Sequence, residues 1–348
     1  MARPSQDVRS PSGHDIVVVG ASAGGVEALA RLVHGLPADL AAAVFVVLHI
    51  TPDAASALPD ILSRAGGLPA LHPADGQRIE PGHIYVAPPD RHLLISGRRV
   101  HVARGPRENG HRPAVDPLFR TAARTFGPRV IGVILSGTLD DGTAGLAAIK
   151  TRGGVAMVQD PNEALFPGMP RSAVENVTVD HVLRIEEIAP RLVSLVNEPV
   201  TASAPAVSHN MDMETRMAEL NEEAVQTDDR PGVPSVFGCP DCGGVLWELG
   251  EGELIRYRCR VGHAYSPDTL STKQLEALED ALWMALRALE EQAALARRLA
   301  ERAEARGHTT IATRFRLRHD EAQDQAEVIR DVLANGRGLG HRAQEAEG

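Results

Sequence analysis

The stretch Ile16-Val17-Val18-Val19-Gly20-Ala21-Ser22-Ala23-Gly24-Gly25 decides the fold of this chain. A short apolar, β-branched run stops at glycines, and apolar residues at helical spacing follow over residues 26–33. This order predicts a buried strand, a sharp turn and a helix. Gly20, Ser22 and Gly24 fit the spacing G-x-S-x-G, which lifts a serine hydroxyl clear of a sheet and beside a helix N-terminus. By themselves, these residues also fit a dinucleotide loop or an ordinary glycine-rich crossover turn.

The alternation of apolar runs and helical patterns continues to residue 198. The runs are Val44–Leu48, His83–Val86, Leu93–Ile95, Val130–Leu135, Val155–Val158 and Val177–Leu183. Strands that alternate with helices predict βαβ units, hence an α/β fold with a doubly wound, mostly parallel sheet. Two of the runs, near 83–87 and 92–102, lie close together in the sequence, and we expect them to form a hairpin inserted in that pattern.

Composition excludes several classes of protein. The chain has 348 residues, 43% of them hydrophobic, and no apolar stretch approaches the roughly 20 residues of a membrane span. The polar N-terminal stretch has no apolar segment typical of a secretory signal, so we expect a cytoplasmic protein without membrane insertion. The net charge is -10, and residues 199–348 hold 26 acidic against 17 basic residues. This acidity argues against nucleic acid as a partner.

The C-terminal part of the chain predicts three further segments. Residues 199–235 are rich in proline and polar residues and are expected to be a linker, with one short helix near 214–224. Residues 236–268 contain every cysteine, and residues 270–336 have a helical pattern broken at Gly307. Apolar residues recur three and four apart from Leu275 through Leu278 to Leu299, which predicts a helical hairpin or, alternatively, a surface for a partner or self-association.

The cysteine segment has the spacing of a metal site. Cys239 and Cys242 form a C-x-x-C pair, and Cys259 and His263 follow at a C-x-x-x-H spacing. Three thiolates and one imidazole complete the tetrahedral shell of a structural zinc ion, with no open position for catalysis. An odd number of cysteines suits this better than a disulfide framework. The alternative is a set of buried, reduced thiols.

Polar residues follow three of the expected strands. Ser22 follows the first, His49 follows Val44–Leu48, and Asp141 follows Val130–Leu135 within a short loop. In a doubly wound sheet, residues beyond the carboxyl ends of the strands share one crevice. A serine hydroxyl needs a neighbouring base, and a carboxylate orients that base, so these three residues predict a Ser-His-Asp triad. Each residue could instead be a helix cap, a turn or a packing residue.

Several separated motifs make the chain resemble a known family. The motifs that carry the resemblance are Gly20-Ala21-Ser22-Ala23-Gly24-Gly25, His49, His111-Arg112-Pro113-Ala114-Val115-Asp116, Leu135-Ser136-Gly137 with Asp141-Gly142, and Gly168-Met169-Pro170. They look like the catalytic domain of CheB-type protein-glutamate methylesterases, over residues 12–198. The resemblance implies hydrolysis of γ-glutamyl methyl esters on chemoreceptors, without a catalytic cofactor. It assigns Ser22 as nucleophile, His49 as base and Asp141 as the orienting acid.

The resemblance also places four residues around the substrate: Ala23, Arg112, Thr138 and Met169. Ala23 stands where the family usually has threonine, and Thr138-Leu139-Asp140 stands where it commonly has Met-Gly-x. The methionine N–H of that loop helps to form the family's oxyanion hole, so Thr138 is expected to supply it here. Asp140 offers a second carboxylate beside Asp141.

The expected function is therefore a serine hydrolase that removes methyl esters from glutamate side chains of chemoreceptor-like proteins, with glutamine deamidation as a further activity. Only about 14 residues precede the first strand, so we expect no receiver domain and a different form of regulation. Two alternatives remain. One is a non-catalytic signalling scaffold acting through the zinc and helical segments, which the altered loop favours. The other is a nucleotide-binding domain, which His49 at the second strand end disfavours.

Overall fold

The computed structural model describes residues 13–51, 56–200, 203–220, 232–251 and 254–335. The chain divides into two compact units, the first ending at Thr269 and the second beginning at Leu270. Parts of the expected linker, residues 201–202 and 221–231, lie outside the described residues, as do the outer ends of the chain.

The first unit is built on a seven-stranded sheet with the order β3-β4-β2-β1-β7-β8-β9. The strands are β1 (Ile16–Ala21), β2 (Ala43–Leu48), β3 (Ala70–Leu71), β4 (Ile84–Val86), β7 (Val130–Ile134), β8 (Val155–Gln159) and β9 (His181–Leu183). All neighbours pair in parallel, and Val18 lies opposite Phe45 on one side and Gly132 on the other. The strand order reverses between β1 and β7, which opens a crevice at their carboxyl ends.

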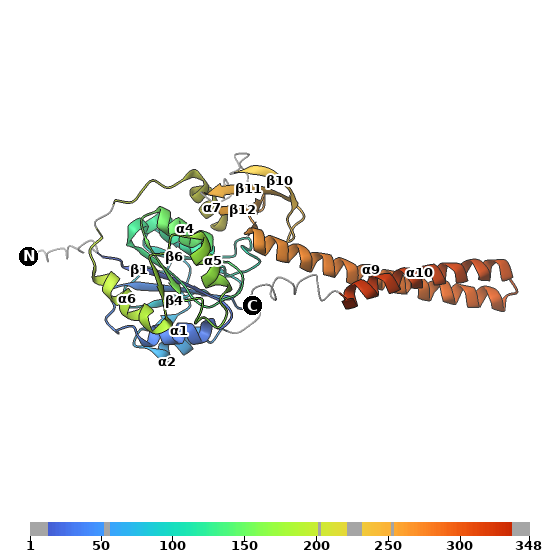
Figure 1. Ribbon diagram of the computed structural model, residues 1–348, viewed down its shortest axis with the longest axis horizontal. Helices are drawn as coiled ribbons and strands as arrows, with labels where there is room; N and C mark the ends of the chain where they lie inside the picture. The colour runs from blue at the N-terminus through green and yellow to red at the C-terminus, as the bar shows by residue number, and fades with distance from the viewer. Residues whose placement is uncertain (1–12, 52–55, 201–202, 221–231, 252–253, 336–348) are drawn as a thin grey trace, which may run out of the picture. The chain divides into compact units, whose positions relative to one another are not determined.

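Helices cover both faces of this sheet (Figure 1). The helices are α1 (Gly25–His34), α2 (Leu58–Ala65) and α6 (Ile185–Asn197) on one face, and α3 (Val115–Phe126), α4 (Thr143–Thr151) and α5 (Gly168–Asn176) on the other. Alternate residues of β1 divide between the two cores: Val17 and Val19 pack with α1 and α6, whereas Val18 packs with α3. This arrangement confirms the doubly wound α/β fold.

One detail of the expected sheet was wrong. The run near 83–87 does not form a hairpin with 92–102, because β4 joins the parallel sheet beside β2. Its Tyr85 ring stacks on Phe45 of β2, with ring centroids 5.1 Å apart, and both are buried. The hairpin lies wholly within the second run, as β5 (His92–Ser96) and β6 (Arg99–Ala103), which are joined by a turn with Gly97 at φ 56°.

The first unit also contains the cysteine segment. A four-stranded antiparallel sheet consists of β10 (Val233–Gly238), β11 (Val245–Glu251), β12 (Leu254–Cys259) and β13 (Ala264–Tyr265). The short helix expected near 214–224 is α7 (His209–Ala218), which begins where the Ser208 hydroxyl accepts a hydrogen bond from Met211 N–H. Methionines of α7 are buried, so this part of the expected linker packs into the unit.

The second unit consists of α9 (Pro267–Ala305) from Leu270 onward and α10 (Thr309–Asn335), joined at Gly307, where φ is 74°. The helices run antiparallel, since His319 bonds the carbonyl of Ala293 and Arg330 pairs with Glu290. The buried seam is Leu286, Ala293, Ala296, Ala300 and Ala303 with Ala312, Ala322 and Ala326. The expected seam was wrong at its start, where Leu278 is 45% exposed, because α10 is shorter than α9 and pairs only with its C-terminal part.

Candidate active site

Ser22 occupies the turn between β1 and α1. Its N–H donates to the carbonyl of Ser136 (3.0 Å), and its own carbonyl accepts from Gly25 N–H (2.9 Å). Gly24 has φ 69°, and a Cβ there would meet Ser136 Oγ at 2.8 Å. Glycine is therefore required at this position, both for the left-handed backbone and for the close approach of the neighbouring strand end.

Ser136, just beyond the end of β7, stabilises that turn through hydrogen bonds. Its hydroxyl donates to the carbonyl of Ala23 (2.8 Å) and accepts from Phe166 N–H (3.0 Å), while its own N–H donates to Gln159 Oε1 (2.9 Å). No sequence pattern pointed to this role of Ser136. The serine turn is thus fixed by contacts from the neighbouring strand end as well as by its own glycines.

The structure brings Ser22, His49 and Asp141 together at the carboxyl ends of β1, β2 and β7. His49 Nδ1 lies 3.1 Å from Ser22 Oγ, and His49 Nε2 lies 2.7 Å from Asp141 Oδ2. A proton on Nε2 donates to the carboxylate and leaves the Nδ1 lone pair to accept the serine proton. The His49 side chain is only 7% exposed, which limits competition from water.

Asp141 accepts hydrogen bonds at both carboxylate oxygens. Oδ2 accepts from Val115 N–H (2.7 Å) as well as from His49, and Oδ1 accepts from Asn109 Nδ2 (2.9 Å) and Asp116 N–H (3.3 Å). Burial raises the pKa of Asp141, but the hydrogen bond and charge of His49, together with the Val115 N–H, outweigh burial and lower it below its usual value. The carboxylate is therefore held charged, as the partner of an imidazolium must be.

Asp116 is the second carboxyl group beside the triad, in the first turn of α3. Burial and the neighbouring charge of Asp141 raise the pKa of Asp116. Its Oδ1 accepts from Gly145 N–H (2.6 Å) in α4, and its Oδ2 accepts from Asn109 Nδ2 (3.0 Å). The two carboxyl groups thus differ in charge preference, with Asp141 favouring the ionised form.

His111 is a further residue at the site, and its sequence motif alone gave it no role. Its ring stacks on that of His49, with centroids 3.7 Å apart and planes 10° from parallel. His111 follows the turn in which Glu108 N–H donates to its carbonyl (3.2 Å) and its own N–H donates back (2.9 Å). The Asn109-Gly110 pair at the centre of that turn is the sequence signal that could have drawn attention to it.

The two adjacent aspartates in the loop before α4 have different hydrogen-bond partners. Asp141 bonds His49, whereas Asp140 Oδ1 accepts from Thr269 Oγ1 (2.9 Å). Thr138 and Leu139 are exposed at the tip of the loop, and Leu139 has φ 57°, in the left-handed region. Leucine rarely adopts that backbone, so the altered loop retains a turn that glycine would form without strain.

The remaining expected substrate residues differ in their placement. Ala23 lies in the serine turn at the N-terminus of α1. Met169 is fully buried, and its N–H donates to the carbonyl of Gly137 (2.9 Å). Its side chain packs against Gly137. Arg112 donates to Asp90 Oδ1 (2.6 Å from Nη2) and to the carbonyl of Gly105 (2.8 Å). Its charge is thereby paired within the protein.

The expected metal ligands also meet. One ligand atom from each of Cys239, Cys242, Cys259 and His263 lies within 4.8 Å of the others. The Sγ atoms of Cys242 and Cys259 are 3.7 Å apart, and His263 Nδ1 is 3.6 Å from Cys259 Sγ. A zinc tetrahedron with bonds of about 2.3 Å to sulfur and about 2.0–2.1 Å to nitrogen has edges of about 3.8 Å and 3.6 Å. The four residues therefore fit such an ion and could bind one.

Several known proteins are similar in sequence to about half of this chain. A relative from Anaeromyxobacter dehalogenans, named protein-glutamate methylesterase/protein-glutamine glutaminase 5, is 40% identical over 199 residues, which are 56% of this chain and 55% of that protein. One from Xanthomonas campestris pv. campestris with the same name, numbered 1, is 36% identical over 196 residues, 55% of this chain and 54% of that protein. The chain thus spans about half the length of these two relatives.

Two further comparisons cover nearly all of the protein matched. A Leptospira interrogans protein is 38% identical over 183 residues, which are 52% of this chain and 95% of that protein. The crystal structure of the Thermotoga maritima CheB methylesterase catalytic domain has a TM-score of 0.50 and 33% sequence identity, over 52% of this chain and 98% of that chain. A sequence model of CheB methylesterase matches residues 17–192, which is half of the chain. The chain therefore belongs to the CheB methylesterase family.

Proposed function

We propose that this protein is a serine esterase that hydrolyses methyl esters of glutamate side chains in chemoreceptor-like proteins. The observation that carries the proposal is the continuous hydrogen-bonded line from Ser22 through His49 to Asp141 at the crevice of the sheet. The names of the Anaeromyxobacter and Xanthomonas relatives support the same reaction and add glutamine deamidation. Among the described residues, no helix has the length and apolar character needed to cross a membrane.

In the first half of the reaction, Ser22 Oγ attacks the ester carbonyl carbon while His49 Nδ1 takes the serine proton. Asp141 stabilises the imidazolium that forms, and it holds the ring in the tautomer that can accept this proton. His49 then gives the proton to the methoxy oxygen, the bond from carbon to that oxygen breaks, and methanol leaves. In the second half, His49 takes a proton from water, the hydroxide attacks the acyl-serine, and the proton returns to Ser22 Oγ. The products are methanol and a free glutamate carboxyl group.

The oxyanion formed in each half needs backbone donors beside Ser22. Ala23 directly precedes Gly24, the N-cap of α1, and the first N–H groups of that helix have no acceptor within it. Thr138 follows Gly137, whose backbone is so close to Ser22 that an added Cβ would lie 2.9 Å from the Ser22 Cβ. We assign the oxyanion to the Ala23 and Thr138 N–H groups, which act through fixed dipoles and need no cofactor.

The surface around Ser22 supports a protein substrate. Leu165 is 71% exposed, and its side chain borders Gly24 of the serine turn. Phe166, next to it, and Leu139 on the facing loop are each more than a third exposed. This apolar rim would pack against the apolar face of a receptor helix that presents the methylated glutamate.

Mass spectrometry of a methylated receptor fragment tests the proposal. Incubation with the full chain should convert glutamyl methyl esters to glutamates at defined sites, and Ser22→Ala should abolish the conversion. Ser172→Ala is the matched control, because that serine bonds Thr143 rather than His49 and should leave the rate unchanged. A folded wild-type chain that leaves every ester intact would refute the proposal and favour the scaffold alternative.

We also propose that the Cys3His cluster holds a structural zinc ion. Two tight turns present its ligands: Gly243 N–H donates to the carbonyl of Cys239 (2.8 Å), and Gly262 N–H donates to that of Cys259 (3.0 Å). Both glycines have positive φ. Elemental analysis of the purified chain should find one zinc per molecule, and Cys259→Ser should lose it. Full retention of zinc by that variant would contradict the assignment.

A further inference from the structure

We propose that the cysteine segment, residues 236–268, hereafter the Cys3His module, positions the catalytic carboxylate of Asp141 through Asn109, so that metal binding raises turnover at Ser22. This inference rests on the proposed esterase function and the proposed zinc site. It makes Asn109 a positioning residue, since it contacts Asp141 and neither His49 nor Ser22 in the hydrogen bonds described above. It also gives the metal a role in the reaction without contact with the substrate.

Asn109 is the residue that the two parts share. Its side-chain Nδ2 donates to Asp141 Oδ1 (2.9 Å) and Asp116 Oδ2 (3.0 Å), while its Oδ1 accepts from Ser266 N–H (3.0 Å). Its backbone N–H donates to the carbonyl of Ala264 (2.7 Å). The Ser266 N–H selects the amide orientation in which both N–H groups face carboxyl groups. The opposite orientation would turn an oxygen toward two carboxyl groups.

The partners of Asn109 in the module are next to its metal ligands. Ala264 directly follows His263, and Cys259 N–H donates to the carbonyl of His263 (2.9 Å), which closes the turn between β12 and β13. A metal ion held by Cys259 and His263 would fix that turn. Ala264 and Ser266 would then be fixed with it. Loss of the ion would leave four ligand side chains without their common partner and would loosen the strand that Asn109 contacts.

A buried ionic cluster anchors the module beside the same turn. Arg258 Nη2 donates to Glu108 Oε1 (2.9 Å), and Arg256 Nη2 lies 3.3 Å from Glu108 Oε2. Glu108 precedes Asn109 in the chain and also accepts two bonds from Arg120 of α3. Glu214 of α7 accepts from Arg256 and Arg258. Each of these side chains is at most 5% exposed, so β12 is built into the catalytic unit and carries Asn109's neighbours with it.

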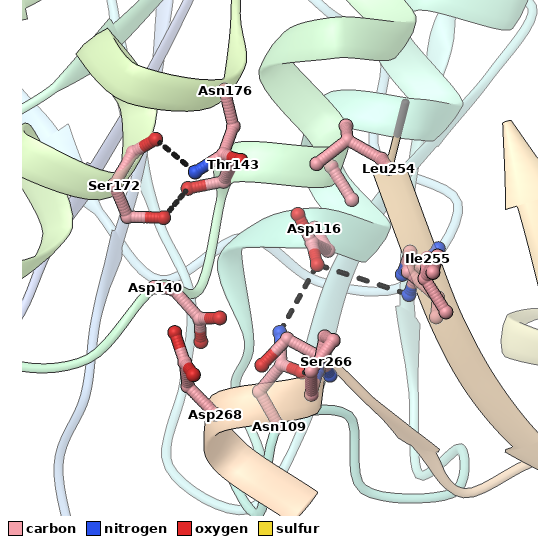
Figure 2. Close-up of a pocket in the computed structure, with 13 residues that line it drawn as sticks. Asn109, Asp116, Asp140, Thr143, Ser172, Asn176, Leu254, Ile255, Ser266 and Asp268 are labelled. Atoms are coloured by element: carbon pink, nitrogen blue, oxygen red, sulfur yellow. Dashed lines mark hydrogen bonds and ion pairs between the residues drawn. The ribbon is translucent and has the colours of Figure 1, made fainter. Parts of the chain in front are cut away.

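A cavity of about 230 Å³ borders this contact (Figure 2). Asn109, Asp116, Asp140 and Ser266 are among its lining residues, and Figure 2 shows Asn109 reaching toward Asp116 beside it. The open space gives the Asn109 side chain room to turn away from Asp141 once Ser266 no longer holds its carbonyl oxygen. The orientation of Asn109 therefore depends on the module rather than on close packing alone.

The test combines metal removal with substitution in the full chain. The readouts are kcat and KM for methyl-ester hydrolysis and the rate at which a fluorophosphonate labels Ser22. The labelling rate reports activation of the nucleophile independently of the ester substrate. Zinc removal from the wild type should lower kcat and the labelling rate about tenfold and leave KM unchanged, with recovery on adding zinc back. Asn109→Ala should show a similar loss, and zinc removal should then add little. Asn197→Ala, an exposed asparagine in α6, is the matched control and should behave as the wild type.

Several outcomes would overturn the inference. Losses that multiply in zinc-free Asn109→Ala would show that the metal acts by another route. Unchanged labelling in either single perturbation would show that Asp141 is positioned without them. Far-ultraviolet circular dichroism identifies a variant that fails to fold, in which case Asn109→Ser, which keeps a smaller hydrogen-bonding side chain, takes its place. Labelling of the wild type without ester hydrolysis would refute the proposed substrate alone, whereas absence of labelling would refute both proposals.

Discussion

Replacing Asp141 by asparagine tests the triad most sharply, because this carboxylate is the acceptor in each of its hydrogen bonds described above. Its two oxygens accept from His49, Val115, Asn109 and the Asp116 N–H. An asparagine side chain must direct its NH₂ at one of these two pairs. Toward His49, it forces the proton onto Nδ1, which can then no longer accept the serine proton. Toward Asn109, it meets two other N–H groups.

The expected magnitude follows from these conflicts. In serine proteases, loss of the correct histidine tautomer lowers kcat by about 10⁴, which corresponds to a rise of about 5 kcal/mol in the activation free energy. Each buried donor left without an acceptor costs about 1–3 kcal/mol of stability. Asp141→Asn should therefore lose about four orders of magnitude in ester hydrolysis and unfold at a lower denaturant concentration, measured by methanol release and by urea titration.

Asp140→Asn is the matched control, one residue away. Burial raises the pKa of Asp140, so its charged form is less favoured than that of an exposed aspartate. Its partner Thr269 has a hydroxyl that can donate to an amide oxygen as well. The activity of Asp140→Asn should remain within a few-fold of the wild type. The reasoning is refuted if Asp140→Asn is the inactive variant, or if Asp141→Asn keeps more than a tenth of the activity.

Three further predictions concern stability and substrate binding. Leu139→Gly should raise the free energy of unfolding, measured in urea, by about 0.5–1 kcal/mol. The left-handed backbone at φ 57° costs leucine about 1–2 kcal/mol, and its side chain is partly exposed, so little packing is lost. A loss of stability would contradict this prediction. Arginine charges hold the pKa of buried Glu108 well below 4.5 despite its burial, so its contribution to stability is present above about pH 4.5 and is lost as the pH falls further. Calorimetry between pH 7 and 3 should show that loss, and Glu108→Gln, about 3–5 kcal/mol less stable at pH 7, should show a smaller slope. Leu165→Ser should raise KM for a receptor fragment several-fold with kcat unchanged, whereas an equal effect on a small soluble ester would contradict a role in protein recognition.

The alternation of apolar runs and helical patterns, which begins at the strand before Ser22, predicted the fold. Buried parallel strands have continuous apolar runs, and the residues after them meet at one edge, so the approach of Ser22, His49 and Asp141 follows from local patterns. The C-x-x-C and C-x-x-x-H spacings were likewise sufficient to find the ligand cluster. The short strand β4 was misplaced because three buried residues fit a hairpin as well as a sheet.

The contacts that support the site were beyond sequence reasoning. Asn109 and Arg258 are far apart in the chain, and no periodic pattern links a turn in the catalytic part to a strand beside the cysteines. Arg112 was expected near the substrate, but its pairing with Asp90 depends on how two loops pack. Likewise, the stacking of His111 on His49 is a property of the folded crevice alone.

Methanol release from a receptor fragment carrying glutamyl methyl esters tests the central claim most directly. The rates for the full wild-type chain and for Ser22→Ala are compared at equal concentration, with zinc content and folding checked in both. The account predicts sustained release of one methanol per ester by the wild type and none above background by Ser22→Ala. Equal release by both proteins, or none by a folded wild type that contains zinc, would contradict it.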